Sequence, residues 1–146
     1  MTGKLYGLGV GPGDSELLTL KAKRILEEVD IICTPQSKPE KDSIALKIVK
    51  EVVDCEEKVK RLLFPMTHQQ EKLKKYWKQA TVEVVDLLQQ GKDVAFITIG
   101  DPLLYSTYIY ILKRIKKAYQ ELDVETVPGI TSINACSAQM NLPLAE

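Results

Sequence analysis

The sequence predicts an α/β fold of three layers, in which helices cover both faces of a five-stranded, mostly parallel sheet. Five short apolar segments alternate with amphipathic stretches of helical spacing, as in repeated strand and helix units. The most apolar segment, Val94–Ile99, is rich in β-branched residues and suits a strand buried on both faces. Three glycine-containing turns, at 9–13, 100–101 and 128–129, each follow a strand, so we expect all three at one edge of the sheet.

The expected strands are short segments of apolar and β-branched residues. Val94–Ile99 belongs at the centre of the sheet because both of its faces are apolar. The third segment alternates imperfectly, with Arg61 among its residues, which indicates an edge position. Pro35 is expected to end the second strand, since proline lacks the N–H that a strand ladder needs. In chain order, strands are predicted at 4–10, 30–34, 58–63, 94–99 and 122–127.

Residues that can cap a helix precede the amphipathic stretches. Asp14 or Ser15 is expected to cap a first helix that extends to Val29, and Asp42 or Ser43 a second helix at Ser43–Val53.

The third helix is predicted to be the longest. It lies between Thr67 and Gly91, and Thr67 and Gln70 have the spacing of a capping box. Its apolar stripe includes Tyr76 and Trp77, which are therefore assigned to the core.

The turn Gly100-Asp101-Pro102 has the features of a helix start. Asp101 is a good N-cap, and Pro102 suits the first helical position, where its missing N–H loses no hydrogen bond. A fourth helix is thus expected to begin at Pro102, with Tyr105 and Tyr108 on its apolar stripe. Its late basic run, Lys113–Lys117, is interpreted as a solvated face.

Composition excludes several classes of function. Twenty basic and twenty acidic residues cancel, so no global field favours nucleic acid or an anionic membrane. No apolar run approaches the roughly 20 residues that span a bilayer, and the chain opens without a signal-peptide pattern. Three widely spaced cysteines fit reduced thiols in a cytoplasmic protein. A single histidine leaves no His-rich metal site, and a Ser-His-Asp triad is possible only if His68 alone serves in it.

The first glycine loop differs from the known phosphate-binding loops. Gly9 and Gly11 are followed by Gly13, not by a glycine three positions on, and Pro12 removes an N–H that a phosphate would use. No Lys-Ser or Lys-Thr pair follows, which excludes a Walker-type loop. The loop therefore predicts a small or uncharged ligand group.

Asp101 has two alternative roles. Capping aspartates are common, so this side chain could serve its own helix alone. It also lies at the sheet edge where the other two turns are expected, and ligands of open α/β sheets bind at that edge. The convergence of the three turns favours a ligand contact.

Three motifs, taken together and in this order, resemble those of the tetrapyrrole methylases: Gly7–Asp14, Ile99–Tyr105 and Val127–Ser132. Phe64–Met66 and the terminal Leu142–Glu146 are similar to the branch that methylates precorrin-2 at carbon 20 in cobalamin biosynthesis. The resemblance covers the whole chain. It implies a homodimeric enzyme of two domains that binds S-adenosylmethionine in a trough between its halves.

In that family a second α/β domain should begin where this chain ends. We therefore expect an N-terminal α/β domain at 1–127. Residues 128–146 are then expected to form a cofactor-binding turn, a short helix at 132–140 and the start of a connection to the second domain. Part of the adenosine pocket and of the tetrapyrrole trough would come from that second half, so this chain alone is expected to be inactive.

The resemblance also implies which residues form the site. The contacts to S-adenosylmethionine are expected from Val10, Gly100, Asp101, Leu104, Thr131 and Ser132. The tetrapyrrole, precorrin-2 or its cobalt complex, is expected along Gly11, Pro12, Gly13, Asp14 and Tyr105. The cofactor has a carboxylate, an ammonium, hydroxyls and a sulfonium but no phosphate, so backbone groups, one carboxylate and small hydroxyls suit it.

Methyl transfer to a nucleophilic carbon mainly requires alignment and exclusion of water. The sequence identifies no catalytic acid or base, and the candidates are His68, Tyr105 and Asp14. Two other interpretations are a non-catalytic ligand-binding or assembly module and a related methylase that acts on diphthamide. Phe64–Met66 and Leu142–Glu146 favour the precorrin branch.

Overall fold

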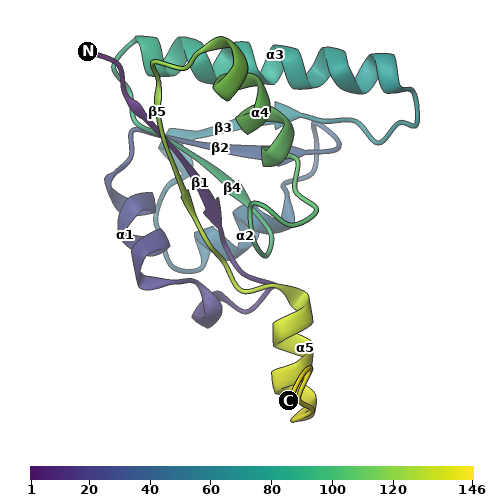
Figure 1. Cartoon of the computed structure of the whole chain (residues 1–146). Coiled ribbons are helices and arrows are strands. Elements are labelled where there is room, and N and C mark those ends of the chain that lie inside the picture. The colour runs from purple at the N-terminus through teal and green to yellow at the C-terminus, as the bar shows by residue number, and fades with distance from the viewer.

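The computed structural model describes residues 1–146 and shows one parallel sheet between two helical layers (Figure 1). Neighbouring strands follow the order β3-β2-β4-β1-β5, and every strand pair is parallel. The strands are β1 Lys4–Gly9, β2 Ile31–Gln36, β3 Val59–Leu63, β4 Val94–Thr98 and β5 Asp123–Val127. The predicted three-layer α/β fold, the central place of β4 and the edge place of β3 are confirmed.

Helices α1 and α2 cover one face of the sheet, and α3 and α4 cover the other (Figure 1). Helix α5 projects beyond the body of the molecule and buries none of its residues. The helices are α1 Leu20–Glu28, α2 Ile44–Lys50, α3 Gln70–Gln89, α4 Tyr108–Ala118 and α5 Ser132–Met140, with short 3-10 turns at Ser15–Leu17 and Glu56–Lys58. No helix combines the length and the apolar character needed to cross a membrane.

Strand β4 divides the core into two halves. All five of its residues are buried, as expected for a strand with a helical layer on each side. Ala95 and Ile97 pack among residues of α1 and α2, whereas Val94 and Phe96 pack among residues of α3 and α4. Successive side chains of a strand point to opposite faces, so the continuous apolar run supplies both halves at once.

Proline does not end β2, contrary to our expectation. The strand continues through Pro35 to Gln36, whose carbonyl accepts a hydrogen bond from Phe64 N at 2.9 Å. Because Gln36 faces β3, Pro35 faces the β4 side, where the pairing of β2 has already stopped at Cys33. The missing N–H of Pro35 therefore removes no ladder bond.

The edge strand β3 is flanked by a ring of four charges. Arg61 pairs with Asp42 at 2.8 Å and with Glu56 at 2.9 Å. Lys50 pairs with the same two carboxylates, at 3.1 Å with Asp42 and 2.6 Å with Glu56. The arginine lowers the pKa of Asp42 to about 2, with Lys50 contributing. Such charges also discourage pairing of an exposed strand edge with another chain.

Two of the predicted helix starts are wrong. Asp14 accepts a hydrogen bond from Glu16 N at 2.9 Å and so caps only the 3-10 turn, while Thr19 caps α1. Thr67 forms no capping box, because its hydroxyl accepts from Gln69 N at 3.2 Å and α3 begins only at Gln70. Of the two caps expected for α2, Asp42 and Ser43, the structure shows Ser43, whose Oγ accepts from Leu46 N at 3.0 Å.

Candidate active site

The three glycine turns meet at the carboxyl edge of the sheet, main chain against main chain. A Cβ atom on Gly129 would overlap the carbonyl oxygen of Gly100 and lie 2.8 Å from Gly9 Cα. A Cβ atom on Gly9 would likewise overlap Gly100 O and lie 2.8 Å from Gly129 Cα. Contact this close is open only to glycine. The predicted convergence of the turns is confirmed.

Hydrogen bonds join the first turn to the second. Gly100 N donates to Gly11 O at 2.8 Å, and Gly11 N donates to Gly100 O at 3.4 Å. These two residues form an isolated antiparallel bridge beyond the parallel sheet. Both have positive φ, 81° at Gly11 and 67° at Gly100, so the conformation also requires glycine there.

Asp101 joins the second turn to the third and caps no helix. Its Oδ1 accepts from Gly129 N at 3.0 Å, and its Oδ2 accepts from Leu103 N at 3.0 Å. The Leu104 N–H donates to the Asp101 carbonyl at 3.3 Å, which closes a turn and not a helix. The expected helix start at Pro102 is therefore wrong, and the carboxylate instead holds two turns together.

Helix α4 begins six residues later, at Tyr108, and the buried Ser106 fixes its start. Ser106 Oγ accepts from Tyr108 N at 3.1 Å and donates to Thr98 Oγ1 at 3.1 Å, which ties the helix to the end of β4. Tyr105 lies outside the helix, with a φ of 50° and a side chain 98% exposed. A left-handed tyrosine is conformationally strained, and such strain often marks functional loops.

The other residues predicted to contact the cofactor lie around these turns. The Val10 side chain is buried in the core, so only its main chain is available to a ligand. Leu104 is exposed. Thr131 caps α5 by accepting from Asn134 N at 3.3 Å, and Ser132 is the exposed first residue of that helix.

The residues predicted to contact the tetrapyrrole form the outer part of the same edge. Gly11 is buried, Pro12 is half-buried, and Gly13 and Asp14 are exposed. No atom outside its chain neighbours would lie within 4 Å of a Cβ atom on Gly13. The segment 12–14 therefore borders open space beside the contact between the turns.

The sequence interpretation missed an aromatic pair beside this edge. Trp77 of α3 stacks on Tyr110 of α4, with ring centroids 3.8 Å apart and an angle of 4° between the rings. Trp77 and Tyr76 are only half-buried and belong to neither core cluster, so their assignment to the core is wrong. One signal was present in the sequence: Tyr110 lies off the apolar stripe of its helix, whose buried members are Tyr108, Ile111 and Ile115.

Residues 4–146 match the family model of the Tetrapyrrole (Corrin/Porphyrin) Methylases. The chain belongs to the tetrapyrrole methylase family. It is 50% identical, over 143 residues, to the probable cobalt-precorrin-2 C(20)-methyltransferase of Methanocaldococcus jannaschii, covering 98% of this chain and 60% of that protein. It is 38% identical, over 145 residues, to the cobalt-precorrin-2 C(20)-methyltransferase of Salmonella typhimurium, covering 99% of this chain and 60% of that protein.

Solved structures of other methylases share the fold. A cobalt precorrin-4 methyltransferase superposes with a TM-score of 0.73 at 25% identity, covering 98% of this chain and 52% of that one. The uroporphyrin-III-C-methyltransferase of Thermus thermophilus superposes with a TM-score of 0.73 at 24% identity, covering 100% and 56%. This tetrapyrrole methylase chain thus spans somewhat more than half the length of the relatives it matches.

The residues at the edge fit S-adenosylmethionine. Asp101 uses two of the roughly four acceptor positions of a carboxylate within the fold and keeps the others for hydroxyl or ammonium donors. The first turn of α5, at Ser132, offers backbone N–H groups that favour a carboxylate. A Cβ atom on Gly100 would reach only ordinary contact, 3.8 Å from Ile130 O and Thr131 Cα, so there is room between the second and third turns.

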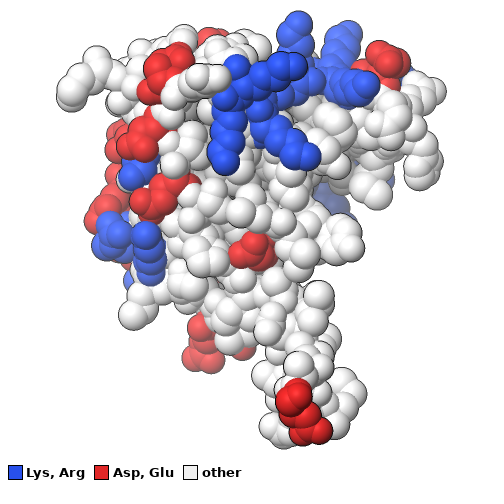
Figure 2. Space-filling model, in the orientation of Figure 1, with Lys and Arg blue, Asp and Glu red and all other residues white.

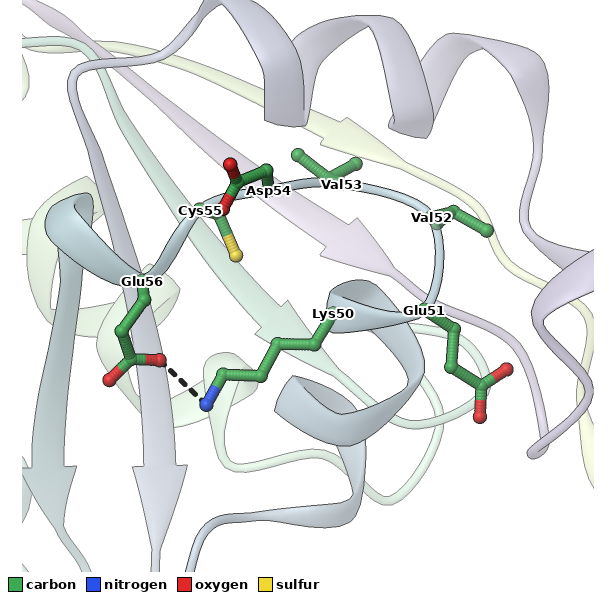
Figure 3. Close-up of a pocket in the computed structure, with 7 residues that line it drawn as sticks. All are labelled: Lys50, Glu51, Val52, Val53, Asp54, Cys55 and Glu56. Carbon is green, nitrogen blue, oxygen red and sulfur yellow. Dashed lines mark ion pairs between the residues drawn. The ribbon is translucent and has the colours of Figure 1, made fainter.

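A hollow lies at the amino ends of the strands, opposite the glycine turns, where α2 leads into β3 (Figure 3). Its volume is about 600 Å³, and it is lined by Lys50 to Glu56. The lysine and Glu56 are paired with each other at 2.6 Å, as Figure 3 shows, and both belong to the charge ring beside β3. Ligands of open parallel sheets bind at the carboxyl edge, so this hollow is not the candidate active site. No three His, Cys, Asp or Glu side chains in the molecule are grouped to hold a metal ion.

Proposed function

We propose that the chain forms the S-adenosylmethionine-binding half of an enzyme that methylates carbon 20 of precorrin-2, or of its cobalt complex, in cobalamin biosynthesis. The single observation that carries this proposal is the main-chain contact of Gly9, Gly100 and Gly129. This contact brings the three turns together at the carboxyl edge of the sheet, where ligands of such sheets bind. The names of the relatives support the reaction and the acceptor. The remaining length of those relatives corresponds to the half that would complete the site.

S-adenosylmethionine, when bound, supplies an activated methyl group. In the proposal the carboxylate of Asp101 and the main chain of Gly100 and Leu104 hold the cofactor from one side. The main chain of Val10 and the residues Thr131 and Ser132 hold it from the other. Gly11 to Asp14 and the strained Tyr105 border the tetrapyrrole. Their task is orientation and exclusion of water, and orientation can lower a barrier by about 7–11 kcal/mol in favourable cases.

No residue at this edge is assigned as an acid or base. Asp14 is occupied as the cap of the 3-10 turn, and His68 and Tyr105 are both exposed. The proposal therefore gives the chain a binding and aligning role, with 1–127 as the α/β domain and 128–146 as the link to the second half. It further places the whole protein in the cytoplasm as a homodimer, a location that three free cysteines support.

The test is a calorimetric titration, with S-adenosylhomocysteine, of the chain extended through the half that completes the site. We expect heat of binding from the wild type and a loss of affinity of about tenfold or more in Asp101→Ala, because the change removes a charged acceptor and releases Gly129 N. Asp54→Ala removes an exposed carboxylate at the opposite edge and should bind like the wild type. Ser132→Ala changes another residue of the proposed cofactor site and keeps the hydrogen bonds between the three turns.

Two results would count against the proposed site. One is an absence of heat with the wild type, and the other is equal affinity in Asp101→Ala, Ser132→Ala and the Asp54→Ala control. Thermal unfolding of each variant shows that the proteins compared are folded.

A further inference from the structure

A hollow of about 300 Å³ lies between α3 and α4, away from the candidate active site. Helix α4 begins close to the glycine turns and ends at Ala118, shortly before β5 starts at the amino ends of the strands. The hollow adjoins this far end of α4. It therefore lies towards the edge of the sheet opposite the turns, and the proposed function does not use it.

Two rows of side chains face each other across the hollow. In each helix the lining residues are three or four positions apart, so they share one face of that helix. Helix α3 contributes Lys78, Thr81 and Val82, and α4 contributes Arg114, Lys117 and Ala118. Thr81 is buried, whereas Lys78 and Lys117 are exposed. The lining thus holds three cations and no acidic residue.

None of the three cations has an acidic partner. Lys and Arg side chains gather over α3 and α4 in Figure 2, and none of those on either helix takes part in an ion pair. The positions three and four residues from Lys78 and from Arg114 hold no Asp or Glu, unlike α1, which forms two ion pairs at the i, i+4 spacing. Like charges around one hollow repel each other, and a bound anion would offset this repulsion.

Arg114 is held across the hollow in a position to bind such an anion. Its Nη2 donates to the carbonyl of Lys74 on α3 at 3.3 Å, and its side chain is half-buried. A guanidinium has five N–H donors in a rigid planar fork, so most of them remain for a ligand. The fork matches oxyanions that accept two parallel hydrogen bonds.

Charge and volume narrow the class of ligand. Three cations are best balanced by an anion with several negative charges, and the hollow is small, at the lower end of the range for ligand sites. A diphosphate group meets both conditions, whereas a single carboxylate carries one charge only. The hollow also has an apolar surface, because Val82 is 41% exposed and the ring of Tyr119 is half-buried.

We propose that the hollow between α3 and α4 binds a diphosphate group, either free or as part of an organic molecule. Arg114 binds one phosphate through its planar fork, and Lys78 and Lys117 bind the remaining oxygens from the two helices. The small volume and the zero net charge of the chain favour a small anion over a nucleic acid. The inference does not depend on the proposed function.

The experiment is a calorimetric titration, with inorganic pyrophosphate, of the chain extended through the half that completes the length of its relatives. Lys78→Gln and Lys117→Gln each remove one charge, while Arg114→Lys keeps the charge and removes the planar fork. Lys116→Gln is the matched control, because Lys116 is an exposed, unpaired cation of the same helix that does not line the hollow. Thermal unfolding shows that each variant is folded.

We expect Lys78→Gln and Lys117→Gln to raise the pyrophosphate Kd by about tenfold, Arg114→Lys by about fivefold and Lys116→Gln by less than about twofold. An equal concentration of sulfate should not displace pyrophosphate. Equal effects of Lys116→Gln and Lys117→Gln, wild-type affinity in Arg114→Lys, or displacement by sulfate would show attraction by charge alone and overturn the proposal. An absence of pyrophosphate binding to the wild type would do the same.

A titration with uridine diphosphate distinguishes the two sources of the diphosphate group. If it binds more tightly than pyrophosphate, and Val82→Ser removes the difference, the site takes an organic diphosphate. Equal affinities of the two ligands assign the free anion.

Binding of S-adenosylhomocysteine should be the same in the wild type and in every variant of the hollow, because the hollow lies away from the glycine turns. The two sites can therefore fail separately: pyrophosphate binding without S-adenosylhomocysteine binding would leave this inference standing and count against the proposed function. The reverse result would overturn this inference alone.

Discussion

Single residues at the carboxyl edge act through contacts between segments far apart in the chain. The carboxylate of Asp101 accepts from Gly129 N, 28 positions away, and from its near neighbour Leu103. Gly9 and Gly129 matter for the atoms they lack, since a methyl group on either would collide with the Gly100 carbonyl. The contact between the turns thus depends on one charged side chain and on the absence of a side chain at Gly9 and Gly129.

Gly129→Ala should therefore damage both the fold and the site. The added methyl group cannot be accommodated without moving a main chain, so we expect a loss of about 1–3 kcal/mol in the free energy of unfolding. The affinity for S-adenosylhomocysteine should fall by about tenfold or more as the turns separate. Urea unfolding and calorimetry measure the two effects.

The neighbouring change Pro128→Ala removes atoms and should leave the cofactor affinity close to that of the wild type. If Gly129→Ala retains both its stability and its affinity, the three turns do not touch in solution.

The same edge shows what the sequence could predict. Local patterns sufficed for β4 and for the glycine turns, because a buried strand and a tight turn are encoded by adjacent residues. The helix-capping role predicted for Asp101 is wrong, because an aspartate before proline has the same local pattern whether it caps a helix or accepts from a distant N–H. Trp77 was misjudged for a related reason: helical spacing places it on a stripe, but only the packing of α3 against α4 shows its partner Tyr110.

At the scale of elements, the carboxyl ends of the strands and the lateral edge strand β3 differ in chemistry. The carboxyl edge is formed by glycine turns, whereas β3 is stabilised by the ring of Asp42, Lys50, Glu56 and Arg61. Each carboxylate of the ring meets two cations and each cation two carboxylates. Such a closed network holds its geometry better than an isolated surface pair.

This ring predicts a pH dependence of stability. The folded state lowers the pKa of Asp42 from 3.8 to about 2, chiefly through Arg61, so folding favours the charged form. The stabilisation is present in full at pH values well above 3.8 and is lost as the pH falls through about 2, below which the carboxylate is protonated in both states. Asp42→Asn should therefore be less stable than the wild type at pH 6, and most of the difference should be lost by pH 2.

Urea unfolding across this pH range provides the measurement, because urea adds no salt that would screen the ring. Asp54→Asn, an exposed aspartate outside any ion pair, is the control and should show no such trend. A gap between wild type and Asp42→Asn that is constant from pH 6 to pH 2 would contradict the assignment.

At the scale of the whole molecule, the chain has no net charge, but its charged side chains are unevenly distributed over the surface. Its ion pairs lie around α1, α2 and the outer strands, and the cations over α3 and α4 are left without partners (Figure 2). Helix α5 extends from the body, and several large apolar side chains on it and just after it are exposed: Ile133, Met140, Leu142 and Leu144. A projecting apolar segment of this kind favours contact with another protein surface.

We expect the chain to self-associate through α5 as its concentration rises. Light scattering should give an apparent mass above that of the monomer at high concentration, and Ile133→Ser with Met140→Ser should restore the monomer. Lys47→Gln with Lys92→Gln, two changes far from α5, should not. A monomer mass at every concentration, in wild type and variants alike, would disprove the association.

The main-chain contact of the three turns also limits how such a protein can evolve. An edge built from backbone atoms has few side chains that selection can exchange, and its glycines tolerate no replacement. An edge of this kind can change little, whereas a loop such as 64–69 makes no such main-chain contact with the turns. Under the proposed function, a change of acceptor would then require substitutions outside the glycine turns, and the turns that hold the methyl donor would stay the same.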